Sequence, residues 1–314
     1  MPDISNSHTV PGLEPTSSTV LSAFIKVLKT SAIAGASTAI LALLAVYAFQ
    51  SKIIYPAALN GGHGRVSTPD EYGLPYEAVD LHTKDGETLK SYLLLHDKND
   101  PSYTNKTVMI LSPNAGNIGH FLPVVKYIFN ALNYNVFIYS YRGYGRSTGS
   151  PSEFGLKVDA DTAMEFVGKH SQLSESSLVC YGRSIGGAVA IYIAYKFPDQ
   201  VSGLILDNTF LSIPKVIPYI FPVLGPFSFL CHEKWPSEEY MKQVPASIPV
   251  LFLSAKKDEI VPPAHMKKLR ALSKSTQKVW REFDDAHHND SIAASGYWDA
   301  FYDFMCDAVS PVGR

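Results

Sequence analysis

The sequence has few cysteines and little net charge, and both shortages exclude classes of protein. Cysteine occupies 3 of the 314 positions, an odd number whose spacings match neither a disulfide framework nor a metal site. Cys180 lies in an apolar run and is expected in the core, whereas a disulfide between Cys231 and Cys306 stays open for an oxidising compartment. The formal net charge of −2 at pH 7 indicates no nucleic-acid partner. We expect no cofactor and no metal ion.

Charged residues are also missing from residues 30–50, near the N-terminus. About twenty such residues suffice to cross the hydrocarbon core of a membrane. A buried helix of a soluble α/β domain is rarely so long without charge, and no clean signal-peptide cleavage site precedes Gln50. We therefore predict a disordered tail over residues 1–29, an uncleaved single-pass signal-anchor helix over residues 30–50 and a linker over residues 51–75.

The basic residues on either side of this stretch bear on its orientation. Lys26 and Lys29 precede it, whereas Lys52 and then Arg65 follow it. Positive charge close to a membrane is commonly cytosolic. The slight excess on the N-terminal side favours a lumenal or extracellular domain, in the endoplasmic reticulum or the plasma membrane.

From residue 76 onward, strand patterns alternate with helix patterns, and Asp85-Gly86 between the first two strand patterns is a hairpin signal. This alternation predicts the α/β class, with a mainly parallel sheet covered by helices on both faces over residues 76–309. The expected strands cover residues 76–83, 89–96, 108–111, 136–141, 178–181, 201–206, 250–254 and 278–283, and the expected helices cover residues 121–132, 158–170, 185–197 and 290–309.

Residues 209–247 interrupt the alternation and are rich in proline and aromatic residues. They follow one predicted strand and precede the next, so they belong at the edge of the sheet where open α/β folds place their sites. This composition is typical of a lid over an apolar pocket that suits an acyl chain. An insertion that only packs, without a ligand, remains the alternative.

The pattern Gly-x-Ser-x-Gly occurs twice, around Ser147 and around Ser184. In a tight turn between a strand and a helix, this pattern exposes the serine and leaves room for no side chain at the flanking glycines. Ser147 runs into Gly149-Ser150-Pro151-Ser152, which is a poor start for a packed helix. Ser184 follows a buried strand pattern and precedes an uninterrupted helix pattern over residues 185–197. We therefore predict that Ser184 is the nucleophile and that Ser147 is a turn residue.

A nucleophilic serine needs a base within hydrogen-bond reach, and the base needs an acid that fixes its tautomer. In a sheet of this kind the acid and then the histidine are expected after the serine, at the ends of late strands. Asp258 follows the strand pattern of residues 250–254, and Asp207 is the alternative acid. His287 and His288 both follow the last strand pattern and compete for the role of base.

An oxyanion hole needs two backbone N–H donors. Ile185, directly after the serine, is expected to supply one of them. The loop after the strand at residues 108–111 is expected to supply the other, and because Pro113 has no N–H we predict Asn114.

Five segments of the chain match one family together: Asn114–His120, Tyr141–Ser147, Gly182–Gly187, Lys257–Pro262 and His288–Asp290. They resemble the bud-emergence-type branch of the α/β hydrolases, close to α/β-hydrolase domain-containing protein 13 and more distantly to protein 17. The resemblance covers residues 50–305 and implies the α/β-hydrolase fold, with Asp258 as the acid and His288 as the base.

One departure from the family and one difference between its branches limit what the resemblance implies about the substrate. Ser112-Pro113 stands where the family usually has His-Gly, which changes the space for substrate. The protein 17 branch resembles enzymes that remove palmitoyl groups from cytosolic proteins, and it attaches to membranes through an N-terminal cysteine cluster. This chain has no cysteine before Cys180, so it is more similar to the protein 13 side, whose members look like single-pass membrane hydrolases.

The prediction is a membrane-anchored serine hydrolase that cleaves an ester or thioester through an acyl-enzyme intermediate. Its expected substrate is an acyl-containing small molecule, a lipid or an acylated protein. A catalytically silent membrane scaffold on the same fold and a serine peptidase are the alternatives. The sequence indicates no oligomeric state.

Overall fold

The computed structural model describes residues 17–309, which divide after Phe49 into two compact units. The first unit contains most of α1 (Ser17–Ile54), a single long helix. By length and composition, the helical stretch Val20–Gly61 is a candidate membrane span.

This helix corrects the predicted tail. Residues 17–29 are helical rather than disordered, so α1 begins well before the predicted start at residue 30, and residues 1–16 lie outside the described part of the chain. The physical reason lies in the sequence, because no proline occurs between Pro15 and Pro56 to interrupt a helix.

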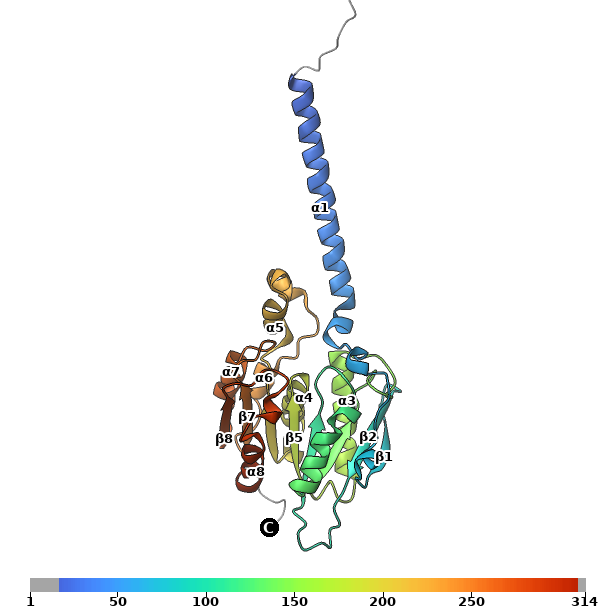
Figure 1. The fold of residues 1–314 in the computed structure, drawn as a ribbon, viewed down its shortest axis with the longest axis vertical. Coiled ribbons are helices and arrows are strands. Elements are labelled where there is room, and N and C mark those ends of the chain that lie inside the picture. Colours follow the sequence, from blue (N-terminus) through green and yellow to red (C-terminus); the bar gives the residue numbers. More distant parts are fainter. Residues whose placement is uncertain (1–16, 310–314) are drawn as a thin grey trace, which may run out of the picture. The chain divides into compact units, whose positions relative to one another are not determined.

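The second unit is built on an eight-stranded sheet with the order β1-β2-β4-β3-β5-β6-β7-β8. Figure 1 shows β1 and β2 at one side of this sheet, and β7 and β8 at the other. β1 pairs with β2, and β2 with β4, in antiparallel fashion, while all the other pairs are parallel. The predicted α/β fold with a mostly parallel sheet is therefore confirmed. The strands are β1 (Glu77–His82), β2 (Thr88–Leu94), β3 (Lys106–Leu111), β4 (Asn135–Tyr139), β5 (Ser177–Arg183), β6 (Gly203–Asp207), β7 (Val250–Ala255) and β8 (Lys278–Phe283).

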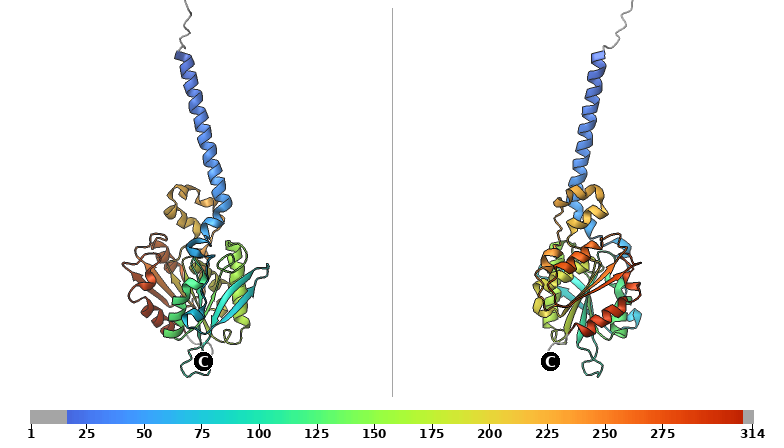
Figure 2. Two further views of the ribbon diagram at one scale, coloured as in Figure 1. Left: turned by 45° about the vertical axis from the view of Figure 1, so that its right-hand side comes forward. Right: turned by 90° about the vertical axis from the view of Figure 1, so that its left-hand side faces the viewer.

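Helices cover both faces of this sheet, as Figure 2 shows from two sides. Successive residues of a strand point to opposite faces, so in β3 Val108 and Ile110 join one apolar core while Met109 and Leu111 join the other. The helices of the second unit are α2 (Leu122–Lys126), α3 (Glu153–Lys169), α4 (Ile185–Lys196), α5 (Ile213–Ile220), α6 (Ser237–Met241), α7 (Ala264–Leu272) and α8 (Tyr297–Asp307). Short helical turns are η1 (Leu59–Gly61), η2 (Pro69–Tyr72), η3 (Ile118–Phe121), η4 (Tyr127–Ala131), η5 (Pro198–Gln200), η6 (Pro222–Leu230) and η7 (Ser291–Ala293).

The strand order places a switch point next to β5. The chain leaves β4, passes over β3 and returns as β5 on the other side of β3. In open α/β sheets, ligands bind at the carboxyl ends of the strands beside such a point. The loops after β3 and β5 therefore meet where a site is expected.

Two further differences from the predictions concern the connections. The segment predicted as a linker packs against the domain, since Tyr55 and Leu74 are buried and η1 and η2 lie within it. Helix α7 has no counterpart among the expected helices. All three cysteines, which lie in the described part of the chain, are free, so Cys231 and Cys306 form no disulfide.

The insertion of residues 209–247 lies between β6 and β7 and contains α5, η6 and α6. Trp235, in the arm of the insertion that returns to the sheet, is fully buried. The amide of Ile213, in the outgoing arm, donates to the carbonyl of Lys234 in the returning arm at 3.0 Å. The two arms of the insertion are thereby held together, while much of its apolar surface is exposed.

Candidate active site

The turn between β5 and α4 holds Ser184 in a strained backbone conformation, with φ 55° and ψ −120°. A residue with a β-carbon rarely adopts a positive φ, and such strain persists only where the surrounding structure imposes it. The amide of Ser184 donates to the carbonyl of Asp207 at 2.9 Å, which ties the turn to the end of β6. The serine is therefore held at the carboxyl edge of the sheet.

The glycines on either side of this serine are required by close backbone contacts. A β-carbon on Gly182 would lie 2.2 Å from the carbonyl oxygen of Gly186. A β-carbon on Gly186 would lie 2.0 Å from the carbonyl oxygen of Leu111, at the end of β3. Because the obstructing atoms are backbone atoms, no rotation of a side chain relieves the overlap.

Three side chains from separate loops form a continuous hydrogen-bonded chain. The Nε2 atom of His288 lies 3.1 Å from the Oγ atom of Ser184, and its Nδ1 atom lies 2.7 Å from Oδ2 of Asp258. The side chains of His288 and Asp258 are 5% and 2% exposed, so water screens their interaction little. The structure thus brings together the serine, the acid and one of the two histidines named from the sequence.

Asp258 is held in place through its second carboxylate oxygen. Oδ1 accepts from the amides of Ile260 at 2.9 Å and Val261 at 2.7 Å. The carboxylate therefore keeps one oxygen for the backbone and turns the other toward His288. This arrangement orients the imidazole with Nε2 toward the serine.

The backbone of His288 is fixed by residues that the sequence alone did not single out for this role. Its carbonyl accepts from Arg183 Nη2 at 2.8 Å and from Asn208 Nδ2 at 3.2 Å, and its amide donates to Glu259 Oε2 at 3.2 Å. His287 instead has a side chain that is 52% exposed and lies 3.3 Å from the same Glu259 oxygen. Of these two adjacent histidines, the geometry therefore favours His288 as the base.

Asp207 lies behind the chain of three side chains rather than within it. Its carboxylate accepts from the hydroxyls of Ser291 and Tyr297, each at 3.0 Å, and Arg183 Nε lies 3.9 Å away. Burial raises the pKa of this fully buried carboxyl. Asp207 therefore supports the segment after His288, and Asp258 is the carboxylate that meets the imidazole.

The two residues predicted for the oxyanion hole lie in neighbouring segments. Ile185 is the first residue of α4, so its N–H has no acceptor within the helix. The loop that carries Asn114 packs against the start of α4, because Leu111 and Ser112 crowd Gly186. Asn114 is itself anchored, since its carbonyl accepts from the hydroxyl of Tyr144 at 2.9 Å and its side chain donates to the carbonyl of Ile54 at 3.1 Å.

The second Gly-x-Ser-x-Gly serine has a structural role. The Oγ atom of Ser147 donates to the carbonyl of Ser140 at 2.9 Å and accepts from the amide of Lys90 at 2.9 Å. The contact with Ser140 ties the loop after β4 to its own start, and the contact with Lys90 ties it to β2. Ser147 is therefore a turn residue, as its sequence context indicated.

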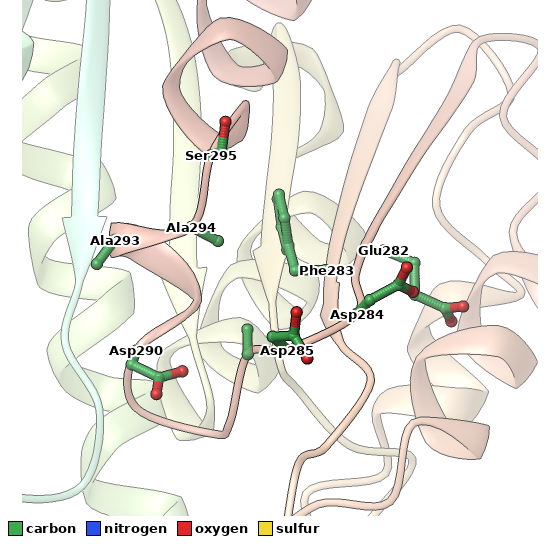
Figure 3. Close-up of a pocket in the computed structure, with 9 residues that line it drawn as sticks. Glu282, Phe283, Asp284, Asp285, Asp290, Ala293, Ala294 and Ser295 are labelled. Carbon is green, nitrogen blue, oxygen red and sulfur yellow. The ribbon is translucent and has the colours of Figure 1, made fainter.

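A separate pocket of about 450 Å³ lies beside the loop that carries His288, and its lining residues are shown in Figure 3. Each of its carboxylates already has a partner. Lys267, Lys256 and Lys257 pair with Glu282, Asp284 and Asp285, and Asp290 accepts from the amide of His287. None of the nine lining residues is Ser184, Asp258 or His288, so this pocket is not the candidate active site.

Comparison with known proteins identifies relatives along most of the chain. A family model described as serine aminopeptidase, S33 matches residues 103–245. An uncharacterized membrane protein of Saccharomyces cerevisiae, YNL320W, is 49% identical over 83% of this chain and 90% of its own length. Protein bem46 of Schizosaccharomyces pombe is 44% identical over 91% of this chain and 95% of its own length. The α/β-hydrolase domain-containing protein WAV2 of Arabidopsis thaliana is 35% identical over 82% of this chain and 88% of its own length.

Solved structures share the fold at low sequence identity. An α/β hydrolase of Vibrio vulnificus has a TM-score of 0.65 and 20% identity, and the match covers 81% of this chain and 91% of that one. The esterase Pf2001 of Pyrococcus furiosus has a TM-score of 0.61 and 17% identity, and the match covers 78% of this chain and 94% of that one. These matches establish the α/β-hydrolase fold.

Proposed function

Because this chain belongs to the family of α/β hydrolases that includes bem46 and YNL320W, we propose that it is a membrane-anchored serine hydrolase that cleaves an ester or thioester. The single observation that carries the proposal is the contact chain from Ser184 through His288 to Asp258. Its members come from the ends of β5, β7 and β8, and nothing in the packing of the sheet requires a buried serine, histidine and carboxylate to meet there.

The proposed reaction begins when Ser184 Oγ attacks the carbonyl carbon of the substrate. His288 Nε2 takes the hydroxyl proton as the new C–O bond forms, and Asp258 stabilises the imidazolium through Nδ1–H. When the tetrahedral intermediate collapses, the bond to the leaving group breaks and His288 returns the proton to the departing alcohol or thiol. Water, deprotonated by His288, then hydrolyses the acyl group on Ser184 and releases the carboxylic acid.

The negative charge on the intermediate falls on the former carbonyl oxygen. We assign its stabilisation to the amides of Ile185 and Asn114, whose segments are held together at Gly186. The removal of one donor of this kind typically lowers kcat by roughly 100- to 1,000-fold. Since both donors are backbone N–H groups, a substitution affects them by shifting the backbone and not by removing a side-chain donor.

The proposed substrate carries an acyl chain. The support for this class is the insertion, which starts close to the nucleophile: Thr209 Oγ1 donates to the carbonyl of Ser184 at 2.7 Å. From there the insertion presents apolar and aromatic residues. A lipid ester or an acylated protein matches this surface better than a polar metabolite does.

The test uses the full chain with p-nitrophenyl esters of increasing acyl length and with acyl-coenzyme A thioesters. Ser184→Ala is expected to abolish hydrolysis, whereas Ser147→Ala, in the other copy of the same pentapeptide, is expected to keep the rate per folded molecule. Hydrolysis that survives Ser184→Ala at the wild-type rate would refute the mechanism and would favour a silent scaffold.

A peptidase is the second candidate, and the description of the family model over residues 103–245 favours it. Aminoacyl p-nitroanilides with a free amine measure this activity directly in the same assay. Turnover of the anilides at rates above those of the acyl esters would place this protein with the peptidases, and a dependence on Ser184 would hold in either case.

We also propose that α1 anchors the protein in a membrane by a single pass, with the hydrolase domain in the lumen or outside the cell. The support is the uncharged stretch of residues 30–50 and the lysines on its N-terminal side. The orientation can be tested in sealed microsomes by labelling Cys306, which is exposed, with Cys306→Ser as the control. A membrane-impermeant maleimide is expected to react with Cys306 only after detergent opens the vesicles. Reaction with sealed vesicles would place the domain in the cytosol.

A further inference from the structure

The insertion between β6 and β7 exposes an apolar face without charge. Residues 216–231 contain no acidic or basic side chain, and within this range Val223 is 85% exposed and Phe229 is 70% exposed. Exposed apolar patches of this kind mark protein or membrane contacts. The apolar face of the insertion consists of Tyr219, Ile220, Phe221, Val223, Phe227, Phe229 and Leu230.

The arm that returns from this face is hydrogen-bonded to the last residue of the proposed membrane span and to the residues that follow it. The amide of His232 donates to Gln50 Oε1 at 2.7 Å, and Glu233 accepts from the hydroxyls of Ser51 at 2.7 Å and Tyr55 at 2.8 Å. All of these residues belong to the second compact unit.

The centre of this junction is buried. Glu233 is 3% exposed, and the indole of Trp235, which is fully buried, donates to the hydroxyl of Tyr55 at 2.7 Å. Burial raises the pKa of Tyr55 well above its ordinary value, so this hydroxyl stays protonated as the donor to Glu233. The base of the insertion is therefore fixed to residues 50–55 by buried hydrogen bonds.

The charges along α1 indicate where a bilayer would end. Residues 30–51 are uncharged, and Lys29 and Lys52 bracket them. At 1.5 Å per residue a helix of this length covers roughly 33 Å, close to the roughly 30 Å thickness of the hydrocarbon core. From their positions in the sequence, Gln50 and Ser51 therefore belong to the last helical turn before the membrane surface.

We propose that the apolar face of the insertion lies in the interfacial layer of the same bilayer that α1 crosses, on the side of the hydrolase domain. The inference rests on the membrane anchor proposed above. Its occupant is lipid rather than a second copy or another protein, because Leu230 is two residues from His232, which binds a residue at the end of the span. Aromatic and aliphatic side chains without charge are suited to this layer.

This placement defines how the substrate arrives. The insertion is rooted at Thr209, which contacts Ser184, and its far end lies in lipid. An acyl chain that is already dissolved in the bilayer meets the apolar face before the nucleophile. The substrate class that follows is a membrane-resident lipid ester, or a protein that carries a membrane-embedded acyl chain, rather than a soluble short-chain ester.

The experiment places a fluorescent probe at single cysteines of the full chain in phosphatidylcholine vesicles. The background is Cys306→Ser, because Cys180 and Cys231 are buried. Val223→Cys tests the face, Leu41→Cys reports insertion of α1, and Tyr302→Cys on α8 is an exposed control within the domain. A nitrobenzoxadiazole group on each cysteine is quenched when lipids carrying a nitroxide on their acyl chains come within contact.

The expected result is strong quenching at Leu41 and Val223 and none at Tyr302. Quenching at Leu41 without quenching at Val223 would overturn the inference and leave the anchor intact. A Val223 probe that is shifted to the blue but not quenched would mean that protein covers the face, and this too would overturn it. No quenching at Leu41 would remove the anchor and the inference together, while ester hydrolysis by the same samples reports on the hydrolase proposal separately.

Discussion

Replacement of glycine by alanine is predicted to have opposite effects on stability at two helical positions. It should destabilise the fold at Gly186, at the crowded start of α4, and stabilise the fold at Gly168, on α3. In Gly186→Ala the new β-carbon would lie 2.0 Å from the carbonyl oxygen of Leu111 and 2.8 Å from that of Ser112. In Gly168→Ala, on α3, the nearest atom is the side-chain Oε1 of Gln200 at 3.3 Å, which can move away. Alanine relieves the entropic penalty of a helical glycine by about 0.5–1 kcal/mol at either position.

The clash decides the difference between the two variants. A β-carbon and a backbone oxygen 2.0 Å apart must separate by about 1 Å to reach ordinary contact, and overpacking of this kind costs about 1–3 kcal/mol. At the midpoints of these two ranges, the cost exceeds the gain in helix propensity by about 1 kcal/mol, so Gly186→Ala should lower Tm by roughly 2–4 °C in a domain of this size. Gly168→Ala should raise Tm by roughly 1–4 °C.

The same displacement reaches the proposed oxyanion hole, because Ile185 and Asn114 lie on the two segments that the clash forces apart. A misplacement of about 1 Å can lower kcat by roughly 100-fold. The assays are thermal unfolding of the full chain in detergent and hydrolysis of a p-nitrophenyl ester. A Gly186→Ala protein with wild-type Tm and wild-type kcat would refute the geometry of the turn, and a slower Gly168→Ala enzyme would show that the effect is not specific to the site.

Three further predictions concern the groups around the nucleophile and a buried carboxylate. Asp258→Asn should lower kcat by about 10⁴-fold with a near-normal Tm, because an amide in place of the carboxylate holds His288 in the wrong tautomer. A kcat equal to that of the wild type would contradict the role of Asp258 as the acid. His288→Ala should abolish ester hydrolysis whereas His287→Ala should retain it, and loss of activity in both would reopen the choice of base. Burial raises the pKa of Asp159 to about 6 despite its contact with Arg142, so the folded state binds this proton more tightly than the unfolded state. Stability from this group is then lost as pH rises from about 4 to about 6, by about 3 kcal/mol, and the Tm of Asp159→Asn relative to wild type should increase over that window; a constant difference would contradict it.

The sheet could be predicted because its central strands, β3 to β7, are short runs of buried residues. The order of strands and helices established the parallel topology, and the predicted strand at residues 278–283 coincides with β8, although β8 is only partly buried. Helix α7 was missed since Pro262 and Pro263 obscure its start and charged residues dilute its apolar face. The early start of α1 was missed because residues 17–22 look like a polar tail, although no proline or glycine interrupts them.

The three side chains of the candidate site could be predicted from the sequence because the carboxyl ends of parallel strands lie at one edge of the sheet. The hydrogen bonds that hold these side chains in place could not be predicted. Arg183 and Asn208 donate to the carbonyl of His288 from 105 and 80 positions away in the sequence, and no local sequence pattern predicts such a contact. The buried bond between Tyr55 and Glu233 spans 178 positions and has no signal in either segment.

The most direct measurement of the central claim is the site at which a fluorophosphonate probe attaches to the full chain. The account predicts one phosphonylated residue, Ser184, identified by mass spectrometry of the peptide that contains it. It also predicts that labelling is lost in Ser184→Ala and strongly slowed in His288→Ala. Attachment at another serine, or labelling that persists in Ser184→Ala, would contradict it.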